Sequence, residues 1–157
     1  MELYIIIIIN FKVVSIVNVL IKELKSNSCK ITPQRIAVYQ TIKDSVDHPN
    51  AEAVFKKLYP AYPTMSLATV YKSLELFSKL GLVQVINIGE NSFRYDGRIE
   101  DHQHIICTHC SKIEDLNNSI FEDLPSKVAD TSNYHINKQQ LCFYGICSDC
   151  LKEASSN

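Results

Sequence analysis

Two Cys-x-x-Cys pairs constrain the fold of this chain of 157 residues more than any other feature. The pairs are Cys107-Thr-His-Cys110 and Cys147-Ser-Asp-Cys150, with 36 residues between them. Each pair forms a tight turn that aims two thiolates at one point, and two such turns complete the tetrahedral coordination of a structural zinc ion. Four protein ligands leave no open position for a substrate. The pattern therefore predicts a structural Zn(II) site that stabilises a small domain.

Disulfides and a redox-active dithiol are the other uses of paired cysteines. Disulfides are typical of secreted proteins, whereas a thioredoxin-like dithiol needs one Cys-x-x-Cys near a βαβ pattern. Cys29 and Cys142 stand alone, and we expect them to be packed, unreactive thiols. His109 lies inside the first turn and is interpreted as a surface residue rather than as a further ligand.

The charge of the chain changes sign along its length. Residues 1–97 carry 11 Lys and Arg against 8 Asp and Glu, giving +3, whereas residues 98–157 carry 5 against 9, giving −4. A basic first part suits phosphates and an acidic second part suits cations, although chance segregation of surface charge would give the same totals. We predict an α+β fold with a DNA-binding domain at 13–97 and an α/β dimerisation and zinc-binding domain at 98–152.

The apolar start of the chain raises the alternative of a signal peptide or membrane anchor, because residues 3–21 are mostly apolar. Lys12 interrupts this run, no basic segment precedes the isoleucines, and no small-residue cleavage site follows them. From Val13 onward the apolar residues follow helical spacing. We therefore expect a cytoplasmic protein whose first helix packs on a core, and we assign no role to residues 1–12.

The order of elements in the first domain is that of a winged helix. Thr32-Pro33 is a helix start, and Ser66 caps a further helix that Gly81 ends. The predicted elements are helices from Thr32, after a loop at 47–50, and at 67–80, and strands at 82–88 and 93–96 joined by a turn at 89–91. The second domain is predicted to have strands at 104–107, 113–116 and 141–146 and a helix at 120–129.

The helix at 67–80 is the predicted DNA-reading element. The side chains on its face away from the apolar stripe are Ala68, Thr69, Tyr71 and Lys72. Tyr71 would pack on thymine methyl groups, and Lys72 would donate to guanine or phosphate. Arg35, Lys56 and Lys57 are candidates for contacts with the DNA backbone. A helix-turn-helix that only mediates protein contacts is the alternative.

A second metal site is suggested by His102 and His104, which lie two residues apart on a predicted strand and so project from the same face. Asp115 lies on the next strand, where antiparallel pairing would bring it alongside. Asp96 and His48 are further candidates, but spacing does not show whether they join, and each residue alone is also compatible with a surface role. Imidazoles with carboxylates would suit Fe(II), Mn(II) or Zn(II) rather than Cu(I).

These segments together resemble the ferric uptake regulator (Fur) family, and its peroxide-sensing (PerR) branch most closely, from about Ile16 to Lys152. The segments that carry the resemblance are Ile31-Thr-Pro-Gln-Arg35, His48-Pro49, Ser66-Leu-Ala-Thr-Val-Tyr71, Phe93-Arg-Tyr-Asp96, His102-Gln-His-Ile-Ile-Cys107 with Cys110, and Tyr144-Gly-Ile-Cys147 with Cys150. The resemblance implies a homodimeric repressor that binds an inverted-repeat operator in double-stranded DNA. It also implies a structural four-cysteine zinc and a regulatory Fe(II) or Mn(II) ion held by His48, Asp96, His102, His104 and Asp115.

The two carboxylates indicate the branch of the family. Peroxide sensors have Asp at the positions of Asp96 and Asp115, where iron-responsive members usually have Glu. Gln103 stands within the His-Gln-His segment and 137–140 lacks a histidine, so we expect no third metal site. The resemblance implies that iron at the regulatory site reacts with hydrogen peroxide and oxidises His48 or His102. An iron-, zinc- or manganese-responsive repressor without peroxide sensing is the alternative.

A zinc enzyme and a redox-switched chaperone are alternatives to a regulator. A zinc enzyme would need a His-Glu-x-x-His or His-x-Glu motif, which is missing beside the cysteines, and we therefore expect no enzymatic activity. A redox-switched chaperone would release zinc on mild oxidation and then bind unfolded proteins.

Overall fold

The computed structural model describes residues 2–89, 92–116 and 121–155, with side chains from Val14 onward to Ala154. The chain divides into two compact units, Met1–Ile99 and Glu100–Asn157. We call them unit 1 and unit 2 and describe each by itself. Among the described residues, no helix combines the length and the apolar character needed to span a membrane.

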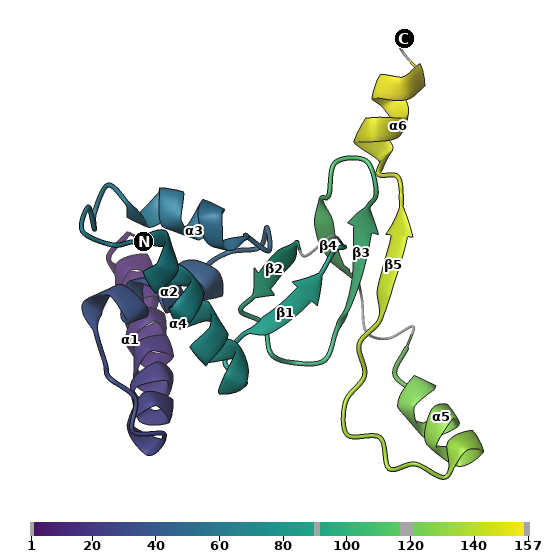
Figure 1. Ribbon diagram of the computed structural model, residues 1–157, viewed down its shortest axis with the longest axis horizontal. Helices are drawn as coiled ribbons and strands as arrows, with labels where there is room; N and C mark the ends of the chain where they lie inside the picture. The colour runs from purple at the N-terminus through teal and green to yellow at the C-terminus, as the bar shows by residue number, and fades with distance from the viewer. Residues whose placement is uncertain (1, 90–91, 117–120, 156–157) are drawn as a thin grey trace. The chain divides into compact units, whose positions relative to one another are not determined.

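Unit 1 consists of helices followed by a β-hairpin (Figure 1). Its elements are α1 (Glu2–Ser26), α2 (Pro33–Lys43), α3 (Ala51–Leu58), α4 (Leu67–Lys79), β1 (Gln84–Asn87) and β2 (Phe93–Asp96). The two strands pair antiparallel, with Gln84 opposite Asp96. This is the predicted winged-helix order. The predicted turn at 89–91 lies partly outside the described residues.

Side-chain caps set where three of these helices begin. The side-chain oxygens of Thr32, Asn50 and Ser66 each accept a hydrogen bond from the backbone N–H three residues further on. Such caps satisfy a backbone donor that has no partner inside the helix. Gly81 has a φ of +68°, which glycine adopts without strain, and it follows the end of α4. The helix starts predicted at Thr32 and Ser66 are confirmed.

The core of unit 1 forms where the apolar faces of its helices meet. Val70, Leu74 and Phe77 of α4 are fully buried. They belong to a cluster that also includes Leu20, Leu24, Val38, Ile42, Val54 and Tyr95. The rings of Tyr39 and Phe77 meet edge to face, with centroids 5.4 Å apart. Because one face of α4 is fixed in this core, its opposite face is available to a partner.

Unit 2 contains a three-stranded mixed sheet in the order β4-β3-β5 (Figure 1). Its elements are β3 (Gln103–Cys107), β4 (Ile113–Leu116), α5 (Leu124–Ser132), β5 (Cys142–Gly145) and α6 (Ser148–Ser155). Strand β3 pairs antiparallel with β4 and parallel with β5. The helix predicted at 120–129 begins later than expected, at Leu124, where Pro125 suits the first turn of a helix. Residue 120 lies outside the described residues.

Candidate metal centres and nucleic-acid interface

The four paired cysteines come together at one edge of the unit 2 sheet. Because β3 and β5 run parallel, their carboxyl ends lie side by side, and each is followed by a Cys-x-x-Cys turn. The Sγ atoms of Cys107 and Cys150 are 3.9 Å apart, and those of Cys110 and Cys147 are 3.8 Å apart. Four sulfurs at ~2.3 Å from a central zinc ion in a tetrahedron lie about 3.8 Å from one another. The geometry therefore fits a structural zinc ion.

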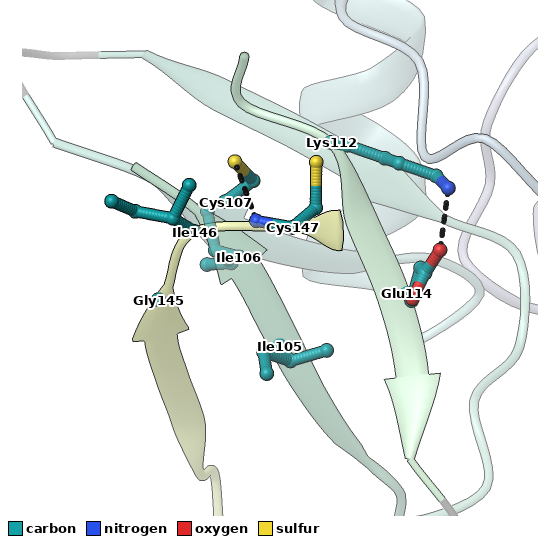
Figure 2. Close-up of a pocket in the computed structure, with 8 residues that line it drawn as sticks. All are labelled: Ile105, Ile106, Cys107, Lys112, Glu114, Gly145, Ile146 and Cys147. Carbon is teal, nitrogen blue, oxygen red and sulfur yellow. Dashed lines mark hydrogen bonds and ion pairs between the residues drawn. The ribbon is translucent and has the colours of Figure 1, made fainter. Parts of the chain in front are cut away.

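Neighbouring groups shift the pKa values of these thiols in opposite directions. The backbone N–H of Cys147 donates to Cys107 Sγ at 3.3 Å, as Figure 2 shows. Hydrogen bonds from the backbone N–H groups of Cys110 and Cys147 lower the pKa of Cys107 to about 6. In contrast, the side-chain contact with Cys147, together with burial, raises the pKa of Cys150. Four adjacent thiols ionise together only when a cation balances their charge.

A small pocket lies beside the first cysteine turn (Figure 2). Its walls are mostly aliphatic, from Ile105, Ile106 and Ile146, and the Lys112–Glu114 ion pair closes one side at 2.6 Å. The cavity volume of about 70 Å³ is well below that of ordinary ligand pockets. We therefore assign no substrate to this pocket.

The β3–β4 pairing brings a carboxylate to the two histidines of unit 2. His104 lies directly opposite Asp115 in the antiparallel register, as predicted. Asp115 Oδ1 is 3.4 Å from His102 Nε2 and 3.6 Å from His104 Nε2. His102 Nδ1 lies 2.7 Å from the carbonyl oxygen of Glu100. Because a carbonyl only accepts, Nδ1 carries the proton, and in the neutral ring Nε2 keeps its lone pair for a metal ion.

His48 and Asp96 form a corresponding pair in unit 1. The backbone N–H of Tyr95 donates to the carbonyl of Pro49 at 3.0 Å, which aligns the loop before α3 with the end of β2. His48 Nε2 then lies 3.7 Å from Asp96 Oδ2. The other carboxylate oxygen, Oδ1, accepts from the backbone N–H of Arg98 at 2.8 Å. This second contact orients the carboxylate, so that Oδ2 is the oxygen directed at the imidazole.

The structure thus places the five candidate ligands in two groups, one in each unit. Within each group, imidazole nitrogens face carboxylate oxygens at distances of 3.4–3.7 Å. Nitrogen and oxygen donors of this kind fit Fe(II), Mn(II) or Zn(II).

The predicted DNA-reading residues lie on the outer face of α4. Ala68, Tyr71 and Lys72 are exposed, while Thr69 is half-buried and its hydroxyl lies 2.9 Å from that of Ser66. The Tyr71 hydroxyl donates to a carboxylate oxygen of Glu52. Arg35, the predicted backbone contact, is half-buried and donates to the carbonyl of Lys30.

Comparison with known proteins identifies the family of this chain. The model of the "Ferric uptake regulator family" matches residues 26–144, which is more than half of the chain. The chain belongs to the ferric uptake regulator family. The expected fold and family are therefore confirmed.

Curated relatives of this Fur-family chain include peroxide regulators. The chain is 35% identical over 133 residues to the "Peroxide operon regulator" of Bacillus subtilis, covering 85% of this chain and 92% of the relative. It is 43% identical over 130 residues to the "Transcriptional regulator PerR" of Clostridium acetobutylicum, covering 83% and 94%. These relatives are named as regulators rather than as enzymes.

Solved structures of similar fold include a peroxide stress regulator and a ferric uptake regulator. The Campylobacter jejuni peroxide stress regulator matches with a TM-score of 0.70 at 34% identity, covering 83% of this chain and 98% of that one. The Helicobacter pylori ferric uptake regulator Fur matches with a TM-score of 0.79 over 88% and 93% of the chains. Because the two sequences are only 24% identical, this match shows that the folds are similar and nothing further.

The backbone groups that orient the candidate metal ligands of this Fur-family chain could not be predicted from the sequence. The Glu100 carbonyl and the Arg98 N–H orient His102 and Asp96, yet every residue type supplies such groups. Gly97 is different, because a Cβ at this position would lie 2.8 Å from the Cα of Lys43. Glycine therefore lets the end of β2 pass close to α2. The glycine directly after Asp96 was the feature of the sequence that could have indicated this close approach.

His48 adopts a left-handed backbone conformation, with φ at +46°. This region is strained for most residues, whereas asparagine tolerates it well. We expect the His48→Asn variant to be more stable than the His48→Ala variant by about 0.5–1 kcal/mol. Urea unfolding without added iron or manganese measures the difference, and both variants lack the imidazole. Equal stability of the two variants would show that the backbone at this position relaxes.

Proposed function

We propose that this chain is a homodimeric, metal-dependent transcriptional repressor that senses peroxide and acts in the cytoplasm on inverted-repeat DNA. The observation that carries the proposal is the pair of imidazole Nε2 atoms, of His102 and His104, directed at one oxygen of Asp115. The names of the relatives, which refer to peroxide response, support the signal. The four-cysteine site, which would leave the ion no open coordination position, supports a structural rather than a catalytic ion.

The regulatory ion would be bound by both units. His48 and Asp96 come from the DNA-binding unit, and His102, His104 and Asp115 come from the unit that holds the zinc site. A ligand shifts a conformational equilibrium by its difference in affinity between states. An ion that needs all five side chains favours the arrangement in which the two groups meet. Metal binding would thereby fix the orientation of the DNA-binding unit.

Oxidation of a ligand histidine would reverse this effect. When bound, iron supplies the electrons that activate hydrogen peroxide, and the net result is transfer of one oxygen atom to an imidazole with release of water. The Nε2 edge of the His102 ring, which faces Asp115, is the side that would react, because Nδ1 is hydrogen-bonded to the Glu100 carbonyl. An oxidised ring binds the metal poorly, so the units lose their fixed orientation and the operator is released.

The test compares iron with manganese. Duplexes selected from random sequence by the metal-loaded protein serve as the operator, and binding is measured before and after hydrogen peroxide. We expect the iron-loaded protein to lose operator binding and to gain the mass of one oxygen atom on peptides that contain His48 or His102. The manganese-loaded protein should keep both its binding and its mass.

An iron-, zinc- or manganese-responsive repressor without peroxide sensing is the second candidate. The same imidazole and carboxylate donors favour it, because they accept each of these ions. Iron-loaded protein that keeps operator binding and unmodified histidines after peroxide would establish this candidate in place of the peroxide sensor.

A further inference from the structure

A hydrogen bond joins the DNA-reading helix to the helix before it. The hydroxyl of Tyr71 on α4 donates to Glu52 Oε1 on α3, with an O–O distance of 2.5 Å. A phenol has a single proton to donate, so this contact engages the donor function of Tyr71. The bond holds the pKa of Glu52 below its usual value and raises the pKa of Tyr71. At neutral pH the pair is therefore a charged carboxylate with a neutral phenol.

The Glu52–Tyr71 pair borders an open, mostly polar cavity of about 310 Å³. The start of α3 forms one wall, Tyr71 of α4 a second, and Ser92, Phe93 and Tyr95 of the hairpin a third. Tyr71 remains 43% exposed, so its ring is available to a partner. The Glu52 carboxylate thus lines a cavity that α4 and the hairpin also border, where it would repel the phosphates of any DNA that enters.

We propose that Glu52 is a specificity-determining residue for DNA binding. This inference rests on the proposed function. By engaging the Tyr71 hydroxyl, Glu52 directs Tyr71 to contact DNA through its ring, which suits an apolar contact with a thymine methyl group. The carboxylate also opposes binding to every phosphate backbone. A duplex with thymine at the contacted position compensates for this repulsion, whereas other duplexes do not.

The Glu52→Gln variant tests the charge while keeping an acceptor oxygen. At fixed ionic strength we expect affinity for non-specific duplex to rise by about threefold, because a repulsive charge is removed. Affinity for the selected operator should rise less, so the ratio of operator to non-specific affinity falls. Glu75→Gln is the matched control, because Glu75 lies on α4 and is bonded to Lys79 at 2.6 Å rather than to Tyr71. An equal change of the ratio in both variants would overturn the proposal.

The Tyr71→Phe variant tests whether the two side chains act together. We expect Tyr71→Phe to reduce the operator preference in the otherwise unchanged protein but to cause no further reduction in a Glu52→Ala background, in which the side chain at position 52 offers the hydroxyl no acceptor. Independent, additive effects would contradict the inference.

A titration without DNA separates this inference from the proposed function. The Tyr71 phenol is followed by NMR in the free protein, and Glu52→Gln should lower its pKa toward the ordinary value for tyrosine. An unchanged phenol pKa would show that the bond is absent in solution and would overturn the inference. A wild-type protein that lacks metal-dependent operator preference would instead overturn the proposed function, while the titration would still test the bond.

Discussion

Replacement of Cys147 by serine is expected to unfold unit 2 while unit 1 stays folded. A structural zinc ion contributes about 10–16 kcal/mol of apparent binding free energy, and in small domains this is folding free energy. In the described part of unit 2, the only buried aliphatic side chains are those of Ile106 and Ile113. Each contributes about 1.5–3 kcal/mol, which is far less than the entropy cost of ordering the unit. Unit 1 has its own helical core, which contains none of the four paired cysteines.

Zinc content and NMR dispersion measure this outcome. The Cys147→Ser protein should contain much less than one zinc ion per chain, and only the signals of unit 1 should remain dispersed. Cys142→Ser is the matched control, because Cys142 lies on the same segment, at the start of β5, but outside the four-cysteine group. A Cys147→Ser protein with full zinc content and a folded unit 2 would contradict the structural role of the ion.

Replacement of Asp115 by asparagine is expected to weaken Mn(II) binding by at least about 100-fold. Asp115 Oδ1 faces the Nε2 atoms of both His102 and His104. The amide keeps the shape of the side chain but removes the negative charge that holds a divalent cation. Operator binding should consequently require about 100-fold more free Mn(II). Fluorescence anisotropy of labelled operator, titrated with Mn(II), measures the shift.

The neighbouring residue provides the control for this experiment. Glu114 precedes Asp115 on β4, so its side chain points to the opposite face, and it pairs with Lys112 at 2.6 Å. Glu114→Gln makes the same change in net charge and should leave the Mn(II) dependence unchanged. An equal loss in both variants would mean that the overall charge of the unit, rather than direct coordination, determines metal binding.

The features that the sequence predicted well are set by nearby residues. The helix starts at Thr32 and Ser66 depend on a side chain and a backbone N–H three residues away. The His104–Asp115 alignment depends on a short turn between two successive strands, which leaves little freedom in the register. Local chemistry of this kind can be read from spacing alone.

The features that the sequence did not predict depend on distant partners. Nothing in the residues around Cys142 indicates that β5 runs parallel to β3, because that pairing is made across a connection of more than 30 residues. The Glu52–Tyr71 bond joins two residues that lie 19 positions apart in the sequence, on different helices. Helix α1 begins at Glu2 although consecutive isoleucines have low helix propensity, so local preference gave no indication of its start.

The four-cysteine group joins two segments that lie far apart in the sequence, and this separation has a consequence for synthesis of the protein. Cys110 and Cys147 are 37 positions apart, so at about 5–20 residues per second the ribosome makes the second pair about 2–8 s after the first. Every residue of unit 1 is translated before either pair. In a zinc-starved cell, newly made chains would therefore have a folded winged helix attached to an unfolded unit 2. Proteases degrade such chains, and zinc supply would thereby set how much repressor the cell accumulates.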